Sequence, residues 1–172
     1  VNGSGIYRYE NDLWVLKSTD DVSGDVQFSD DGDVIAQIGL GYWEWGGSEY
    51  TFTSNSELAA ISRDGTVYAT QTDNIVEIKS EATGTRIGSL IFKPVQGNSY
   101  TIRLSSDGTK LMLCNGQLIY VYVYTTNWFR LGQDVVVYEI DEVSFTGNGT
   151  AFFIYNVNEI YDLTNTGVGR LY

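Results

Sequence analysis

The chain has 172 residues, of which 42% are hydrophobic and 14% aromatic, so it can bury a core and is not a disordered chain. A formal net charge of −12 repels phosphate backbones and anionic lipid, and no apolar run is long enough for membrane insertion, so the sequence predicts neither a nucleic-acid partner nor a membrane span. The 13 tyrosines, 19 glycines and single proline favour strands and tight turns over helices.

A short phrase returns four times along the chain. It reads Phe-Ser-Asp-Asp-Gly at 28–32, Ile-Ser-Arg-Asp-Gly at 61–65, Leu-Ser-Ser-Asp-Gly at 104–108 and Phe-Thr-Gly-Asn-Gly at 145–149. The closing glycines, Gly32, Gly65, Gly108 and Gly149, are 33, 43 and 41 residues apart. A repeat of about 40 residues has the size of one four-stranded propeller blade. The Asp-Gly and Asn-Gly pairs supply the positive φ that a tight hairpin turn needs.

Strand patterns flank each phrase, and two further patterns precede the first repeat. In chain order, the predicted strands cover residues 6–9 and 13–16, then 25–29, 34–39, 42–46 and 49–53, then 58–62, 66–72, 75–79 and 86–92, then 100–105, 110–114, 118–124 and 128–131, and finally 142–146, 151–155, 159–163 and 168–172. Four strands per repeat joined by short turns predict an all-β propeller of antiparallel four-stranded blades. We expect a half blade over 1–18 and blades over 19–54, 55–93, 94–132 and 133–172.

The opening pair of strands resembles the third and fourth strands of a blade. Because the chain also ends on third and fourth strands, its two ends do not complement each other in one ring. We therefore expect these residues to belong to a longer propeller or to assemble with further copies of the chain.

The repeat resembles the WD40-like superfamily in its Ser-x-Asp-Gly turns at 62–65 and 105–108 and in its Thr-Gly turns at 83–84 and 166–167. The segment 128–135, Trp-Phe-Arg-Leu-Gly-Gln-Asp-Val, is similar to a phrase in large repetitive propeller proteins of diatoms and related algae. The resemblance implies a propeller fold. The chain departs from true WD40 blades because it has no histidine and no Trp-Asp pair closing a third strand, so their buried His–Asp network cannot form and their partner modes are not carried over.

Catalytic residues are not predicted anywhere in the chain. Without histidine there is no Ser-His-Asp or Cys-His machinery, and the single cysteine, Cys114, lies in an apolar strand pattern where we expect a small buried hydrophobe. No phosphate-binding or zinc motif appears, so we expect no cofactor. Glu44 and Glu77 lie in strand patterns and could be inward-facing acids of a glycosidase pair, but an exposed strand face is the favoured account of both.

The densest acidic cluster is Asp30, Asp31 and Asp33 around the first repeated glycine. Such carboxylates could bind Ca²⁺, but their spacing does not match a calcium loop, and a solvated hairpin turn is the alternative.

Trp43 and Trp45 lie on one face of a strand, where they could stack on sugar rings or anchor a protein partner. The alternative is that they fill the space between neighbouring blades. Two glycosylation sequons, at Asn2 and Asn148, favour an extracellular or cell-surface location over an intracellular scaffold. The sequence thus predicts a non-catalytic interaction module that binds proteins or further copies of itself, the alternative being a carbohydrate-binding or glycan-active propeller.

Overall fold

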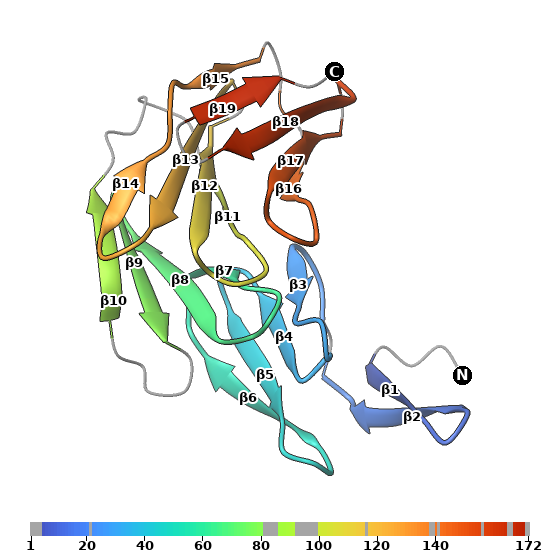
Figure 1. Ribbon diagram of the computed structural model, residues 1–172. Helices are drawn as coiled ribbons and strands as arrows, with labels where there is room; N and C mark the ends of the chain where they lie inside the picture. Colours follow the sequence, from blue (N-terminus) through green and yellow to red (C-terminus); the bar gives the residue numbers. More distant parts are fainter. Residues whose placement is uncertain are drawn as a thin grey trace.

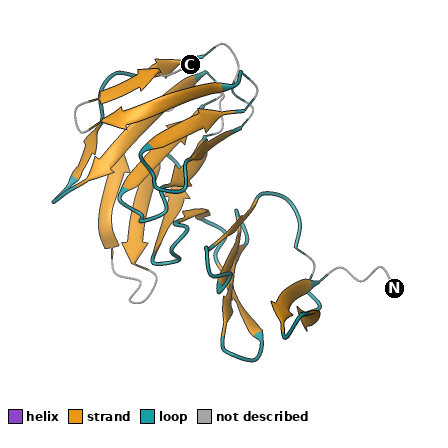
Figure 2. Ribbon diagram, turned by 45° about the vertical axis from the view of Figure 1, so that its right-hand side comes forward, coloured by secondary structure: helices purple, strands orange, loops and turns teal. Residues whose placement is uncertain are grey.

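The computed structural model describes residues 5–20, 22–80, 86–91, 100–115, 117–137, 140, 142–155, 157–164 and 167–170. Across these ranges every regular element is a β-strand, and no helix is present (Figure 2). In particular, no helix in the described ranges is long and apolar enough to cross a membrane. The all-β prediction is therefore confirmed.

The strands form one hairpin and four larger antiparallel sheets, which we call the N-terminal hairpin and blades 1 to 4. The N-terminal hairpin consists of β1 (Ile6–Glu10) and β2 (Leu13–Ser18). Blade 1 consists of β3 (Val26–Phe28), β4 (Val34–Gln37), β5 (Gly41–Trp45) and β6 (Tyr50–Ser54), and blade 2 of β7 (Leu58–Ile61), β8 (Val67–Thr72), β9 (Ile75–Ser80) and β10 (Arg86–Ile91). Blade 3 consists of β11 (Thr101–Leu104), β12 (Lys110–Cys114), β13 (Leu118–Tyr124), β14 (Trp128–Arg130) and β15 (Val135–Val136), and blade 4 of β16 (Val143–Phe145), β17 (Ala151–Ile154), β18 (Glu159–Thr164) and β19 (Gly167–Arg170).

Each blade is a meander in which neighbouring strands follow one another in the chain, and the first strand of each blade lies innermost (Figure 1). Strand β7 contacts β3 on one side and β11 on the other, and β11 also contacts β16. The blades therefore follow one another around a common inner side, as in a propeller. Strand β15 lies in the range expected for the last blade but pairs with β13 of blade 3, next to β14.

The repeated phrase forms the turn between the first two strands of each blade, which we call the inner hairpin. In blade 3, the Ser105 hydroxyl donates to Asp107 Oδ1 at 2.7 Å and accepts from the Lys110 amide at 2.9 Å. Ser29 and Ser62 make the same two bonds in blades 1 and 2, and Thr146 makes them in blade 4 with an asparagine in place of the aspartate. In each turn a serine or threonine hydroxyl thus accepts the amide hydrogen bond that the β-ladder does not supply at this position.

The core lies between successive blades rather than inside a single sheet. Leu104 of β11, for example, packs with Ala60 and Ala69 of blade 2, and Val143 of β16 packs with Met112 of blade 3. Cys114 lies in the same cluster as Met112 and Val143 and is 4% exposed, so the prediction of a small buried hydrophobe is confirmed.

Candidate interaction site

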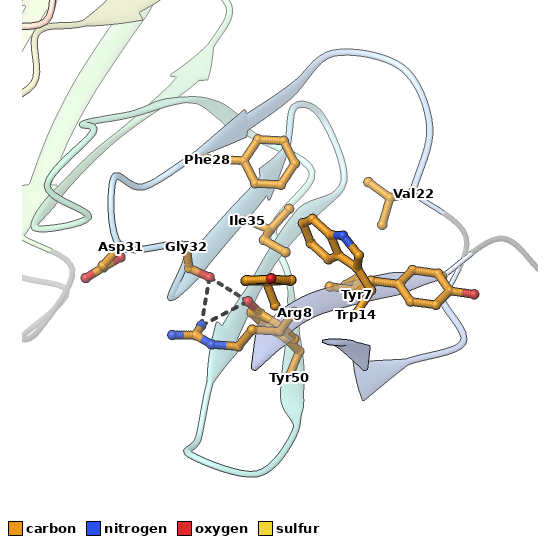
Figure 3. A pocket seen from close by; sticks show the side chains of 12 residues that line it. Tyr7, Arg8, Trp14, Val22, Phe28, Asp31, Gly32, Ile35 and Tyr50 are labelled. Carbon is orange, nitrogen blue, oxygen red and sulfur yellow. Dashed lines mark hydrogen bonds between the residues drawn. The ribbon is translucent and has the colours of Figure 1, made fainter. Parts of the chain in front are cut away.

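A hollow of about 490 Å³ separates the N-terminal hairpin from blade 1 (Figure 3). Strand β1 supplies one wall through residues 6–9, and the opposite wall comes from Phe28, Ile35 and Tyr50 of blade 1. The lining is mainly apolar and aromatic, with Gly32 and Asp31 of the first repeated turn at its edge. The hollow thus presents an apolar and aromatic surface at the junction of the two sheets.

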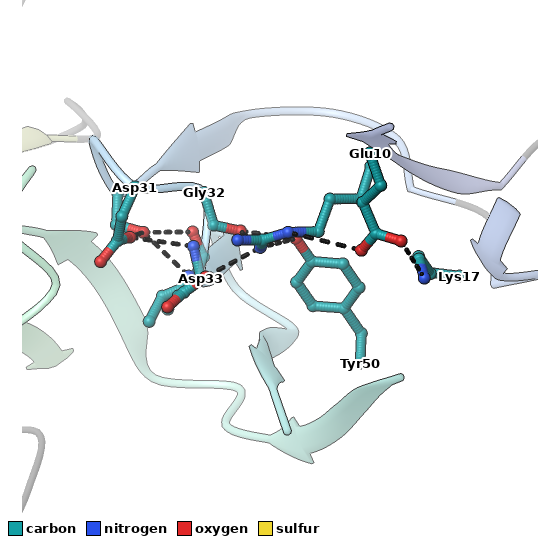
Figure 4. Close-up of polar contacts among 9 residues, drawn as sticks. Glu10, Lys17, Asp31, Gly32, Asp33 and Tyr50 are labelled. Atoms are coloured by element: carbon teal, nitrogen blue, oxygen red, sulfur yellow. Dashed lines mark hydrogen bonds and ion pairs between the residues drawn. The ribbon is translucent and has the colours of Figure 1, made fainter. Parts of the chain in front are cut away.

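Arg8 fastens the N-terminal hairpin to blade 1 at the floor of this hollow. One guanidinium nitrogen donates to the Gly32 carbonyl and to the Tyr50 hydroxyl, both at 3.3 Å, and forms an ion pair with Asp33 at 2.8 Å (Figure 4). The Tyr50 hydroxyl itself donates to the Gly32 carbonyl at 2.5 Å. The hydrogen bond with Tyr50 and the contact with Asp33 raise the pKa of Arg8, against the opposing effect of desolvation. Arg8 is therefore a permanent cation that fixes the first repeated turn.

Four aromatic side chains of the hollow stay largely open to solvent. Tyr7, Tyr9, Trp14 and Phe28 are 43%, 57%, 70% and 58% exposed. Leu16, which lies opposite Tyr7 in the hairpin and is 46% exposed, extends this apolar surface along β2. Contiguous exposed apolar surface of this kind marks an interaction site more often than a solvated face.

Trp43 and Trp45, for which stacking on a sugar or a partner was predicted, both face the N-terminal hairpin. Trp43 is 3% exposed, lies in a cluster with Ile6, and donates through Nε1 to Asp20 Oδ2 at 2.8 Å, which lowers the pKa of Asp20. The Trp45 ring lies under Arg8 at 4.8 Å and under Lys17 at 5.0 Å. Burial of Trp43 weighs against a stacking surface and favours the alternative that these rings fill the space between neighbouring sheets, so the stacking role stays a prediction.

The three clustered carboxylates have separate partners. Asp30 pairs with Arg63 of blade 2 at 2.6 Å, and Asp33 pairs with Arg8. Asp31 accepts from the Asp33 amide at 2.9 Å and from a serine hydroxyl, and these bonds lower the pKa of Asp31. In the part of the chain that the structure describes, no three such groups are placed to hold a metal ion. The turn and the ion pairs account for all three carboxylates, and Ca²⁺ binding stays a prediction.

The remaining predicted residues lie apart from the hollow. Glu44 is in β5 of blade 1, whereas Glu77 is in β9 of blade 2 and pairs with Lys79 at 3.2 Å. The glycosidase pair stays a prediction. Asn148 is exposed in the inner turn of blade 4, where its side-chain oxygen accepts from the Thr150 hydroxyl at 2.9 Å. Asn2 lies outside the described residues.

A second hollow, of about 340 Å³, opens on the inner side of the four blades. Arg103 of β11 reaches Asp25 of blade 1 across it, at 3.1 Å. Because its acidic and basic side chains neutralise each other, this hollow offers little net charge to a ligand.

The sequence analysis missed Arg8, Tyr50 and Phe28 as components of the site. One signal was available for Phe28, because this position precedes the repeated serine and carries a large apolar residue in every repeat, as Ile61 and Leu104 show. No local pattern indicates Arg8 or Tyr50, because their contact joins residues 42 positions apart.

No family model matches the chain, and no curated protein matches it. Among solved structures, it is similar to a functionally unknown protein from Desulfotomaculum acetoxidans DSM 771, with a TM-score of 0.61, 15% identity and coverage of 86% of this chain and 54% of that chain. It is also similar to the WD40 domain of SCAP from fission yeast (TM-score 0.61, 10% identity, 85% and 40% coverage) and to a chain of the mitotic checkpoint complex (TM-score 0.54, 14% identity, 86% and 50% coverage). At these identities the likeness shows the fold alone, which is a β-propeller. The chain spans about half the length of these structures.

Proposed function

We propose that this chain is a non-catalytic protein-interaction scaffold. The observation that carries the proposal is the exposed aromatic surface around the hollow between the N-terminal hairpin and blade 1, where Tyr9, Trp14 and Phe28 are each more than half exposed. Aromatic side chains in such a setting are the usual anchors of protein interfaces. One of the similar structures is an assembly of several proteins, which fits a scaffold role.

Photo-crosslinking from single exposed positions tests the proposal. A photoreactive phenylalanine derivative is placed in turn at Phe28, Phe52, Phe129 and Tyr155, which are 58%, 44%, 52% and 48% exposed. Irradiation in an extract of the organism that makes the protein should give defined protein adducts from at least one position. Absence of protein adducts from all four, together with retention of the chain on a glycan array, would refute the scaffold and favour the glycan-binding alternative.

An extracellular or cell-surface setting is the finer part of the proposal, and the sequons support it. Asn148 is exposed, so its side chain is accessible for modification. The intact mass of the protein from its natural source should fall after enzymatic removal of N-glycans. A mass equal to that of the bare polypeptide would favour the intracellular alternative.

A further inference from the structure

The outer strand of each blade has one edge without a neighbour in its own sheet, and three of the four blades protect this edge. In blade 2, β10 begins at Arg86, has a β-bulge between Arg86 and Gly88, and packs through Gly88 against Trp128 of blade 3. In blade 3, β14 has three residues and ends at Arg130, and in blade 4, β19 has four residues, of which two are glycines and the last is Arg170. Short strands, bulges and charged side chains are the usual means by which proteins prevent a sheet edge from pairing with another chain.

Strand β6 of blade 1 has none of these features. It is the outermost strand of its blade (Figure 1), it runs for five residues, Tyr-Thr-Phe-Thr-Ser at 50–54, and it pairs with β5 without a bulge. None of the residues 50–56 is charged, and none is glycine or proline. Residues 51–54 are exposed, and among the described residues β6 pairs with β5 alone. The outer edge of β6 can therefore accept a further strand.

Hydrogen bonds at both ends of β6 show which of its backbone groups point to this open edge. The Gly46 amide donates to the Glu49 carbonyl at 2.9 Å, and the Asn55 amide donates to the Leu40 carbonyl at 2.8 Å. Because hydrogen-bonded positions alternate along an antiparallel pair, the residues on either side of Phe52 bond to β5. The amide and carbonyl of Phe52 therefore point away from β5 toward the open edge, as do those of the first and last residues of β6.

A second copy of β6 complements this edge. When two copies pair antiparallel about a two-fold axis at Phe52, Tyr50 lies opposite Ser54 of the second copy, Thr51 lies opposite Thr53, and Phe52 lies opposite itself. In this register every residue of β6 has a partner, and the residues whose backbone groups point outward form the hydrogen-bonded pairs. Aromatic pairs and Thr–Thr pairs across neighbouring strands both stabilise antiparallel sheets.

The side chain of Phe52 also fits a two-fold contact. It is 44% exposed, although its ring centroid lies 4.6 Å from that of Trp43 in β5. Side chains that lie opposite each other in an antiparallel pair share one face of the sheet, so Phe52 of the second copy would lie beside the exposed side of this ring. The contact would then form a row of four aromatic rings, with Trp43 and Phe52 from each copy, and would remove an exposed aromatic side chain from water.

The distribution of charge favours a second copy over a basic peptide at this edge. Two copies, each with a net charge of −12, repel each other unless they meet where charge is absent, and charges act over about 8 Å at physiological ionic strength. The segment 50–56 carries no charge, and in the two-fold register Glu49 lies opposite Asn55 of the second copy rather than opposite a carboxylate. A basic peptide would find no carboxylate in this segment with which to pair.

Further propeller blades do not compete for this edge. The blades follow one another around a common inner side, and β6 lies on the opposite, outer side of its blade. An additional blade, from the same polypeptide or from another, would lie beside an existing blade around that inner side. The outer edge of β6 would stay open.

We propose that β6 is an interface between two copies of this chain, in which the two strands pair antiparallel about a two-fold axis at Phe52 and join the two four-stranded sheets of blade 1 into one. The contact occupies both open edges, so the assembly ends at two copies. It goes beyond the scaffold function proposed above and does not use the exposed aromatic side chains of the hollow.

Sedimentation of the full chain over a concentration series tests the proposal. Pairing of two edge strands buries less surface than a standard interface, so we expect a monomer–dimer equilibrium that is populated below about 1 mM chain. The dimer fraction should rise with salt, because salt screens the repulsion between the two acidic copies. In hydrogen exchange, the Phe52 and Ser54 amides should gain protection as the concentration rises, whereas the Thr51 and Thr53 amides, which bond to β5, should not change.

Charges introduced at the two-fold position test the register. Phe52→Lys and Phe52→Glu each place like charges opposite each other and should weaken dimerisation about tenfold or more, whereas an equal mixture of the two variants should form a dimer with one copy of each. Phe129→Lys is the matched control, because Phe129 is 52% exposed on the outer strand β14 and should leave dimerisation unchanged. Circular dichroism checks that each variant folds. Ser54→Pro is a second variant that should stay monomeric, because it removes an amide that points to the open edge and leaves the bonds to β5 intact.

The proposal is overturned if the chain stays monomeric up to about 1 mM, if folded Phe52→Lys or Ser54→Pro dimerises like the unchanged chain, or if the mixed Phe52 variants do not pair. In the crosslinking experiment described above, the photoreactive residue at Phe52 should give an adduct of two chains. Adducts with other proteins but none between two chains would overturn this inference and leave the scaffold function standing. An adduct between two chains without any adduct to another protein would support the interface although the scaffold function fails.

Discussion

Each inner turn contains one serine or threonine hydroxyl with the same two hydrogen bonds. Replacement of Ser105 by alanine measures how much this hydroxyl contributes to stability in the turn of blade 3. Ser105 is fully buried, and its hydroxyl accepts from the Lys110 amide at 2.9 Å and donates to Asp107 at 2.7 Å. Alanine leaves the amide without this acceptor in a place that water cannot easily reach. An unsatisfied buried donor costs about 1–3 kcal/mol. Asp107 is exposed, so water replaces its lost bond and adds little to this cost.

Thermal and urea unfolding measure the effect. For a chain of this size, 1 kcal/mol corresponds to roughly 2–4 °C in Tm, so Ser105→Ala should lower Tm by roughly 2–12 °C. The matched control is Ser106→Ala, one residue along the same turn, where the hydroxyl makes one long bond of 3.4 Å to Asp30. This control should change the free energy of unfolding by less than about 0.5 kcal/mol. Equal effects of the two substitutions would refute the assignment of the turn's stability to the repeated serine.

The inner turn of blade 3 also supports two further predictions. Partial desolvation raises the pKa of Asp107, but hydrogen bonds from the turn outweigh it and lower the pKa. Its carboxylate therefore stabilises the fold above its unfolded pKa, and this contribution is lost as pH falls through the lower folded value. Asp107→Asn, which copies Asn148 of blade 4, should keep the turn at neutral pH and flatten acid unfolding below about pH 4. An unchanged acid transition would contradict this prediction. In urea unfolding, Gly108→Ala should lower the free energy of unfolding more than Gly32→Ala. Both residues have positive φ, but a Cβ atom at Gly108 would also meet Val67 at 2.7 Å. Similar losses of unfolding free energy in the two variants would argue against tight packing between the turns.

The strands could be predicted from the sequence because each repeat encodes its own local geometry. The strands expected at 110–114 and 118–124 match β12 and β13 in their bounds, since apolar runs and a fixed Asp-Gly turn determine where each strand begins. Strand β15 was not predicted. It has two residues, Val135 and Val136, and it exists through pairing with Leu118 and Ile119, which no local pattern reveals.

The candidate site was harder to predict, because burial depends on which sheet lies opposite. Alternation along β5 correctly places Trp43 and Trp45 on one face, but it does not show that the N-terminal hairpin covers this face. Phe28 illustrates the opposite case. Its sequence position is the same as that of the buried Leu104, and its exposure follows from the absence of an inner hairpin beside it among the described residues.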